Sequence, residues 1–129
     1  MNDSVSPKPD SYHRFLDYSV VESGDGFVRL EMTGFDRHRN RGDYIHGGVV
    51  MSLLDIAGIM AGSSGSGEKR KAVTVNLNTN FLSTAMGETV HAEGRVTRKG
   101  RSMFFCDCRV IDAATGKLHA TGQGVYKYL

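Results

Sequence analysis

The sequence contains little cysteine: Cys106 and Cys108 are the only two in 129 residues. Both fall in a segment that alternates as a strand does, so their side chains share one face, where such a pair is poorly placed to form a disulfide. The five histidines are scattered along the chain. We therefore expect two buried, reduced thiols and no metal site.

A long hydrophobic run is also absent. The best candidate, Gly47 to Gly62, is rich in glycine and has Asp55 in its middle, and it is shorter than the roughly 20 apolar residues that span a membrane. The first ten residues are polar, carry Pro7 and Pro9, and lack the apolar stretch of a signal peptide. We expect a soluble, cytoplasmic protein with no membrane contact.

Excess charge of one sign is missing too. The formal net charge of +2 is too small to indicate nucleic-acid binding, and no nucleic-acid-binding motif is present. A chain of this length accommodates one hydrophobic core. We predict a loose tail over residues 1–10 and a single domain over residues 11–129.

Periodicity of apolar residues predicts one long helix among strands. A short helix is expected over Ser11–Tyr18, then a hairpin of Ser19–Ser23 and Phe27–Met32, and three or four strands after residue 72. In the strand Ala72–Leu82, we expect one face to carry Val73, Val75, Leu77 and Phe81, and the other Thr74, Asn76, Asn78 and Asn80.

The long helix runs from Gly47 to about Ala61 and is ended by the Gly- and Ser-rich loop Gly62–Gly67. It is apolar around most of its circumference, so it must be covered on most sides. The economical solution wraps a curved antiparallel sheet of five or six strands around it. The fold class predicted is therefore α+β.

Asp55 is the one charged residue between Gly47 and Gly67. It lies more than two turns into the helix, where aspartate is unfavourable, and burying a carboxylate is costly unless it has a partner. These features favour a general base or a nucleophile. The alternative is that Asp55 caps a shorter helix beginning at Ile56.

His46, Gly47 and Gly48 stand where this helix begins. Glycines there leave backbone N–H groups open at the positive end of the helix dipole, which suits an oxyanion hole; a simple turn is the alternative. Gly47 and Asp55 are about 12 Å apart along the axis, too far to act on one carbonyl. If both act, the active unit is a dimer in which Gly47 of one chain meets Asp55 of the other.

The spacing of Asn40, His46-Gly47-Gly48 and Asp55 resembles the signature of small hotdog thioesterases of the PaaI and thioesterase superfamily member type. The resemblance extends from Phe35 to the C-terminus and includes Val73–Asn78, Lys99–Arg101 and Ala114–Leu118. It implies a hotdog fold, homodimers that often pair into tetramers, and hydrolysis of an acyl-CoA thioester without a cofactor, since coenzyme A is part of the substrate.

The resemblance also implies the roles of five residues. Asp55 matches the catalytic carboxylate, which activates water or, alternatively, attacks directly to give a mixed anhydride. Gly47 matches the residue whose N–H polarises the thioester carbonyl, and Asn40 a polar residue that helps to hold the thioester or water. His46 is the motif histidine, working or structural. Thr74 falls where the family has a Ser or Thr near the attacking water.

Positive charge gathers at Arg37–Arg41, Lys69–Lys71 and Arg98–Arg101. The phosphates of CoA pair with such groups, although ordinary solvated charge is the alternative for each cluster. For substrate binding we favour Gly48, Arg98, Lys99, Gly100, Arg101 and Ser102.

Two rival functions remain on sequence grounds. A non-catalytic acyl-CoA-binding or regulatory hotdog module would need no carboxylate in the helix, so Asp55 argues against it. A hotdog dehydratase or hydratase pairs a helical acid with a histidine in a different motif. Here His46 directly precedes the glycines, which fits hydrolysis better.

Overall fold

The structure, a computed structural model, describes residues 10–65 and 70–129. The predicted tail, apart from Asp10, and the end of the loop Gly62–Gly67 lie outside this part of the chain. The helical elements are α1 (Tyr12–Leu16), the 3₁₀ turn η1 (Asp36–His38) and α2 (Gly47–Ala61). The strands are β1 (Tyr18–Gly24), β2 (Phe27–Thr33), β3 (Ala72–Phe81), β4 (Thr89–Lys99), β5 (Met103–Asp112) and β6 (Leu118–Tyr128).

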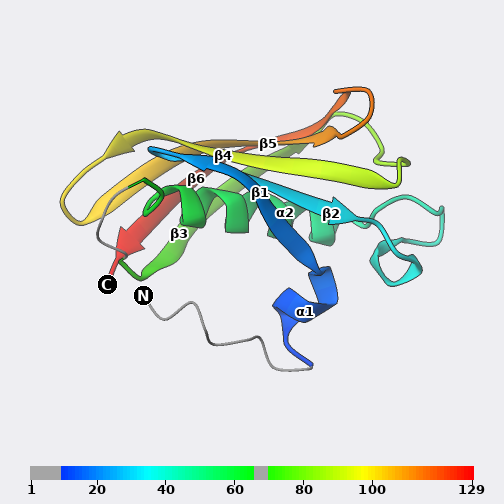
Figure 1. The fold of residues 1–129 in the computed structure, drawn as a ribbon, viewed down its shortest axis with the longest axis horizontal. Helices are drawn as coiled ribbons and strands as arrows, with labels where there is room; N and C mark the ends of the chain where they lie inside the picture. Colours follow the sequence, from blue (N-terminus) through cyan, green and yellow to red (C-terminus); the bar gives the residue numbers. More distant parts are fainter. Residues whose placement is uncertain (1–9, 66–69) are drawn as a thin grey trace.

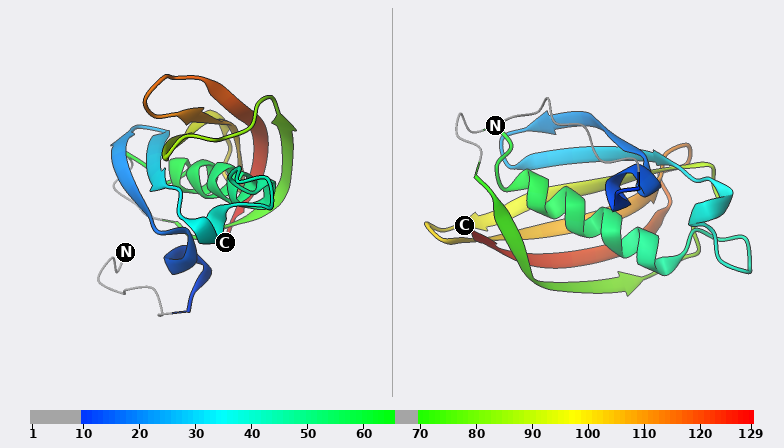
Figure 2. Two further views of the ribbon diagram at one scale, coloured as in Figure 1. Left: turned by 90° about the vertical axis from the view of Figure 1, so that its right-hand side faces the viewer. Right: turned by 90° about the horizontal axis from the view of Figure 1, so that it is seen from below.

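The six strands form one antiparallel sheet in the order β1-β2-β4-β5-β6-β3, so β1 and β3 are its two edges. The sheet curves around α2, which lies on its concave side, and α1 sits beside α2 on the side of β1 (Figures 1 and 2). This confirms the predicted α+β arrangement. It also shows that Asp55 does not cap a shorter helix, because α2 is continuous across it.

The helix and the sheet approach each other closely in the middle of α2. A Cβ atom on Gly94 of β4 would lie 2.3 Å from the carbonyl oxygen of Ala57, and one on Gly58 would lie 2.2 Å from the hydroxyl of Tyr126. Glycine at both positions therefore allows contact between helix backbone and sheet. This contact fixes the height of α2 above the sheet.

One face of α2 packs into the core and the other does not. The buried residues of the helix are Val49, Val50, Leu53, Leu54, Ala57, Gly58 and Ala61. On the opposite face Met51 is 38% exposed, and Asp55 is half-buried. The expectation that the sheet covers most of the helix is thus wrong for this face, which no strand crosses in the view from below in Figure 2 and which α1 contacts through the hydrogen bond between Tyr12 and Ser52.

The expected faces of β3 are corrected by a β-bulge. The register of β3 against β6 shifts between Thr74 and Asn76, so an extra residue, Val75, enters the strand. Thr74 therefore faces α2, on the same side as Leu77 and Phe81, while Val73 and Val75 are 44% and 55% exposed. The alternating pattern predicted the wrong faces because one inserted residue moves every later side chain to the opposite face of the sheet.

Cys106 and Cys108 are free and buried, as predicted, and both are directed at α2. The Cys106 thiol donates a hydrogen bond to the Gly58 carbonyl at 3.2 Å. Burial, more than the nearby acidic groups, raises the pKa of each thiol to about 12. Neither is a reactive nucleophile near neutral pH. Among the described residues, no helix has the length and apolar character needed to cross a membrane.

Candidate functional site

The N-terminus of α2 carries one free backbone donor. The Nδ1 atom of His46, the N-cap residue, accepts a hydrogen bond from the Gly48 N–H at 2.9 Å. The Gly47 N–H donates to no atom of residues 10–65 and 70–129. His46 is therefore a helix cap, Gly48 is engaged by it, and Gly47 alone offers an N–H at the positive end of the helix.

Asn40 shares a pocket with this donor. Its side-chain oxygen accepts hydrogen bonds from the backbone N–H groups of Gly42 at 2.9 Å and Tyr44 at 3.2 Å, which shapes the loop leading to α2. Asn40 and Gly47 line the same pocket, of about 380 Å³. The remaining lining residues are Tyr44, Ile45, Val50, Phe81, Leu82, Ser83, Thr84, Ala85 and His119. The side-chain NH₂ of Asn40 makes no hydrogen bond with a described residue and so remains available as a donor in this pocket.

Asp55 forms a second group on the open face of α2. Its carboxylate accepts a hydrogen bond from the Thr74 hydroxyl at 2.7 Å, which the bulge in β3 directs toward the helix. Asp55 makes no ion pair with any described residue. The carboxylate is half-buried and keeps most of its hydrogen-bonding capacity free for a water molecule or substrate.

The predicted site residues therefore form two half-sites on one helix. Asn40 and Gly47 stand at its N-terminus, and Asp55 and Thr74 lie in its middle, with about 12 Å of helix between Gly47 and Asp55. Each half contains what the other lacks, since one has donors for an oxyanion and the other a base.

Comparison with known proteins decides the family. The model of the thioesterase superfamily matches residues 42–118. The chain belongs to this superfamily. Human acyl-coenzyme A thioesterase 13 is 30% identical over 112 residues, which cover 81% of this chain and 75% of that one. The 30% identity is a similarity between the two chains, and the activity in that name belongs to the human protein.

Solved structures of the superfamily share the fold. Zebrafish thioesterase superfamily member 2 superposes with a TM-score of 0.83 at 30% identity, covering 93% of this chain and 87% of that one. The PaaI protein of E. coli gives a TM-score of 0.83 at 22% identity, covering 94% and 86%. The hotdog fold and the PaaI-type resemblance are thereby confirmed.

Apart from Gly48, which begins α2, the predicted CoA-binding residues lie elsewhere. Arg98 and Lys99 end β4, and Gly100, Arg101 and Ser102 form the exposed turn before β5. The structure brings Arg70 to this basic turn. The Arg70 guanidinium donates to the Arg101 carbonyl at 3.1 Å and lies 4.0 Å from the ring centroid of Tyr128. Lys99 approaches the same ring at 5.7 Å. Two of the three sequence clusters thus come together near the C-terminal end of α2; Lys69 lies outside the described residues.

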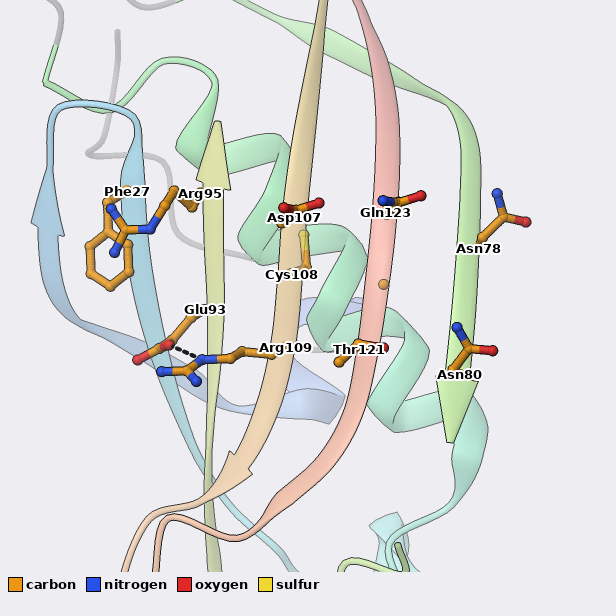
Figure 3. A pocket seen from close by; sticks show the side chains of 11 residues that line it. Phe27, Asn78, Asn80, Glu93, Arg95, Asp107, Cys108, Arg109, Thr121 and Gln123 are labelled. Carbon is orange, nitrogen blue, oxygen red and sulfur yellow. Dashed lines mark hydrogen bonds and ion pairs between the residues drawn. The ribbon is translucent and has the colours of Figure 1, made fainter. Parts of the chain in front are cut away.

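A larger pocket, of about 580 Å³, lies on the outer face of the sheet and contains none of the predicted site residues. Figure 3 shows Glu93 there, directed at Arg109. Glu93 also pairs with Arg29, at 2.6 Å for each arginine. These contacts satisfy the carboxylate. No group of three or more His, Cys, Asp or Glu side chains within the described ranges is placed to hold a metal ion.

The sequence analysis missed two residues of the pocket at Gly47. His119 and Ser83 line it and form a hydrogen bond of 2.8 Å between Nδ1 and Oγ. The register between β5 and β6 shifts next to His119, where Val110 pairs with Ala120 and Ile111 with Leu118. Because this bulge is not visible in an alternating pattern, nothing in the sequence indicated that the histidine lies at the site.

Proposed function

We propose that this chain is an acyl-CoA thioesterase whose active sites are shared between two protomers. The observation that carries the proposal is Asp55: a carboxylate on the open face of an apolar helix, held by one hydroxyl and, among the described residues, by no cation. A carboxylate so placed can take a proton from water. Membership of the thioesterase superfamily and the similarity to human acyl-coenzyme A thioesterase 13 support the reaction class.

The proposed reaction is hydrolysis by activated water. Asp55 removes a proton from a water molecule, which Thr74 helps to position, as the water oxygen attacks the thioester carbon. The carbonyl oxygen becomes an oxyanion and accepts hydrogen bonds from the Gly47 N–H and the Asn40 amide. When the tetrahedral intermediate collapses, the C–S bond breaks and Asp55 returns the proton to the CoA thiolate. The products are the free acid and CoA.

A second protomer is needed to join the two half-sites. The outer edge of β3 pairs with no described strand, and it presents Val73 and Val75 to solvent. Such an edge favours pairing with another copy. A two-fold axis that runs α2 antiparallel to its partner would place Gly47 of each chain opposite Asp55 of the other. We propose this dimer, and pairs of such dimers, acting in the cytoplasm.

The same arrangement accounts for the position of the basic turn. This turn lies near the end of α2 that follows Asp55, because Lys99 approaches the ring of Tyr128, whose hydroxyl donates to the Gly62 carbonyl. The partner's helix would begin at this end. A CoA bound there would meet guanidinium and ammonium groups with its phosphates. Gly100 and Ser102 would contact the nucleotide through the backbone.

The first test is catalytic. The purified protein should release free thiol from at least one member of a panel of short, long and aromatic acyl-CoAs, detected with a disulfide reagent. Absence of turnover on every ester would favour a binding module. A single turnover in ¹⁸O-water separates the two roles of Asp55. Water activation puts one ¹⁸O atom into the product acid and none into Asp55, whereas direct attack followed by hydrolysis of the anhydride at the Asp55 carbonyl puts the ¹⁸O atom into Asp55 and none into the acid.

The second test asks whether the site is shared. Gly47→Pro removes the N–H donor at the first position of the helix, where proline is tolerated and the extended His46 backbone accommodates it. Random 1:1 co-expression of Gly47→Pro with Asp55→Asn should restore about a quarter of the wild-type rate, because half the dimers regain one of two sites.

Two controls define this result. Co-expression of Asp55→Asn with Asp55→Ala rebuilds no site and should stay inactive. Gly47→Ala retains the N–H and should keep most of the activity, because its Cβ would lie at an ordinary 3.4 Å from Phe81. If the Gly47→Pro and Asp55→Asn mixture is as inactive as its components, both residues belong to a site within one chain.

A further inference from the structure

Tyr126 is the largest fully buried side chain among the described residues, and its hydroxyl reaches the backbone of α2 at Asp55. The side chain, in β6, is 0% exposed, and its hydroxyl donates a hydrogen bond to the Asp55 main-chain carbonyl at 3.3 Å. Phenylalanine would fill almost the same volume without a polar group that needs a partner. Packing alone therefore does not explain why a hydroxyl lies here.

Two glycines make room for this hydroxyl. A Cβ atom on Gly124, two residues earlier in β6, would lie 2.3 Å from the Tyr126 hydroxyl oxygen, and one on Gly58 of α2 would lie 2.2 Å from it. The ring itself stacks on Phe104, with 4.9 Å between the ring centroids. Strand, helix and neighbouring ring thus hold Tyr126 in one orientation, with its hydroxyl directed at Asp55.

The hydroxyl acts as a hydrogen-bond donor to the helix. Burial raises the pKa of Tyr126, so the hydroxyl keeps its proton at neutral pH. The Cys108 thiol also contacts this hydroxyl. Sulfur is a weak acceptor, whereas a main-chain carbonyl has two lone pairs, one of which remains after the helical hydrogen bond. The proton of Tyr126 therefore goes to the Asp55 carbonyl, and the thiol can donate to the hydroxyl oxygen.

Tyr126 and Thr74 hold the same residue from two sides. They are opposite each other in the register of β3 and β6, so both side chains face α2. Thr74 donates to the Asp55 carboxylate at 2.7 Å, and Tyr126 donates to the Asp55 backbone. Two neighbouring strand residues thus fix both the side chain and the main chain of the proposed base. A displacement of about 1 Å in such a group can cost about 10²-fold in rate.

We infer that Tyr126 is a positioning residue for Asp55. By fixing the Asp55 backbone against β6, its hydroxyl keeps the carboxylate within reach of the Thr74 hydroxyl and of the attacking water. Tyr126 itself is buried and touches no reacting atom. The inference rests on the proposed thioesterase function, and it extends the site from the open face of α2 into the core.

The first test removes the hydroxyl and keeps the ring. In Tyr126→Phe we expect kcat to fall about fivefold and KM to change less than about twofold, because the groups proposed to bind substrate are untouched. The matched control is Tyr128→Phe, which removes the hydroxyl that donates to the Gly62 carbonyl at 2.6 Å and keeps the ring that Arg70 and Lys99 contact. Both variants should lose about 3–6 °C in melting temperature, but the control should keep its kcat.

A double-mutant cycle asks whether Tyr126 acts through the contact between Asp55 and Thr74. Once Thr74→Val has released the carboxylate, fixing the backbone has less to preserve. Tyr126→Phe should therefore lower kcat less than about twofold on the Thr74→Val background, against about fivefold on the wild type. Tyr128→Phe should leave kcat unchanged on both backgrounds.

A spectroscopic measurement tests the positioning without turnover. The carboxyl ¹³C signal of Asp55, identified by its loss in Asp55→Asn, should move in Tyr126→Phe toward its position in Thr74→Val. It should stay in place in Tyr128→Phe. If no ester is hydrolysed but this signal moves as expected, the positioning stands and the proposed hydrolysis does not.

Where esters are hydrolysed, three results would overturn the inference and leave the thioesterase function intact: a wild-type kcat in Tyr126→Phe, a fivefold loss that persists in full on Thr74→Val, or an unmoved Asp55 signal. If Tyr126→Phe does not fold, the wild-type spectrum decides. The Tyr126 hydroxyl proton should exchange slowly enough to be observed and should show a nuclear Overhauser contact to the α-protons of Gly58. A hydroxyl proton in fast exchange with solvent would contradict the hydrogen bond to Asp55.

Discussion

Two carboxylates in this molecule lie in comparable positions, each in an element that packs at the centre of the fold, and their surroundings differ. Glu93, in β4, is 6% exposed and ion-paired with both Arg29 and Arg109. Asp55, in α2, is half-buried and has one neutral hydroxyl partner, Thr74. Glu93 is satisfied by its neighbours, whereas Asp55 keeps its charge available for a reactant.

The difference shows that burial of a charge does not by itself indicate a functional site. Burial raises the pKa of Glu93, but the hydrogen bonds and charges of Arg109 and Arg29 outweigh it and leave the pKa below its usual value of 4.5. Such a group is locked in its ionised form and contributes to stability. Catalysis requires instead a carboxylate that can exchange a proton.

The largest effect is expected at Asp55. Asp55→Asn removes the base but leaves the Thr74 hydroxyl a partner, so kcat/KM should fall about 10³-fold while the fold is retained. Thiol release measures the activity and urea unfolding measures the stability. A variant that hydrolyses its ester at the wild-type rate would remove the proposed base, and one that loses activity only by unfolding would make Asp55 a structural residue like Glu93.

Glu93→Gln should show the opposite pattern. It leaves two arginines without their carboxylate, and the free energy of unfolding should fall by about 2 kcal/mol at pH 7, with kcat unchanged. Because folding lowers the pKa of Glu93, its contribution is present above pH 4.5 and is lost as the pH falls through the folded value.

The measurement is urea unfolding of the wild type and Glu93→Gln from pH 7 down to pH 3. The difference in unfolding free energy between them should shrink below pH 4.5, the usual pKa of this carboxyl. A constant difference over this range would mean that the ion pairs contribute nothing, and a lowered kcat at equal stability would assign the outer face a role in catalysis.

The smallest effect is expected at Thr74. Thr74→Val removes the only hydrogen bond that a described side chain donates to the Asp55 carboxylate, and kcat/KM should fall about tenfold. Thr74→Ser retains a hydroxyl and should recover most of the loss. If valine and serine behave alike, the hydroxyl does not position the carboxylate or the water, and Asp55 acts without support from β3.

The helical part of this site could be predicted from the sequence, and the sheet part could not. The spacing of apolar residues located α2, and its lone charge identified Asp55. The bulges at Val75 and beside His119 were invisible, because inserting one residue changes the direction of a side chain without changing composition. The contact of Arg70 with Tyr128 depends on the pairing of β3 with β6, which brings together residues that are far apart in the sequence.

Gly94 has a consequence for how this protein can change. It touches no predicted site residue, yet the space it leaves for the Ala57 carbonyl determines how far α2, and hence Asp55, stands from the strands. Loops at the pocket can be exchanged to accept new acyl groups while this spacing persists. The loops can therefore vary with the substrate, whereas the contact between Gly94 and Ala57, which is remote from the reacting atoms, must stay the same.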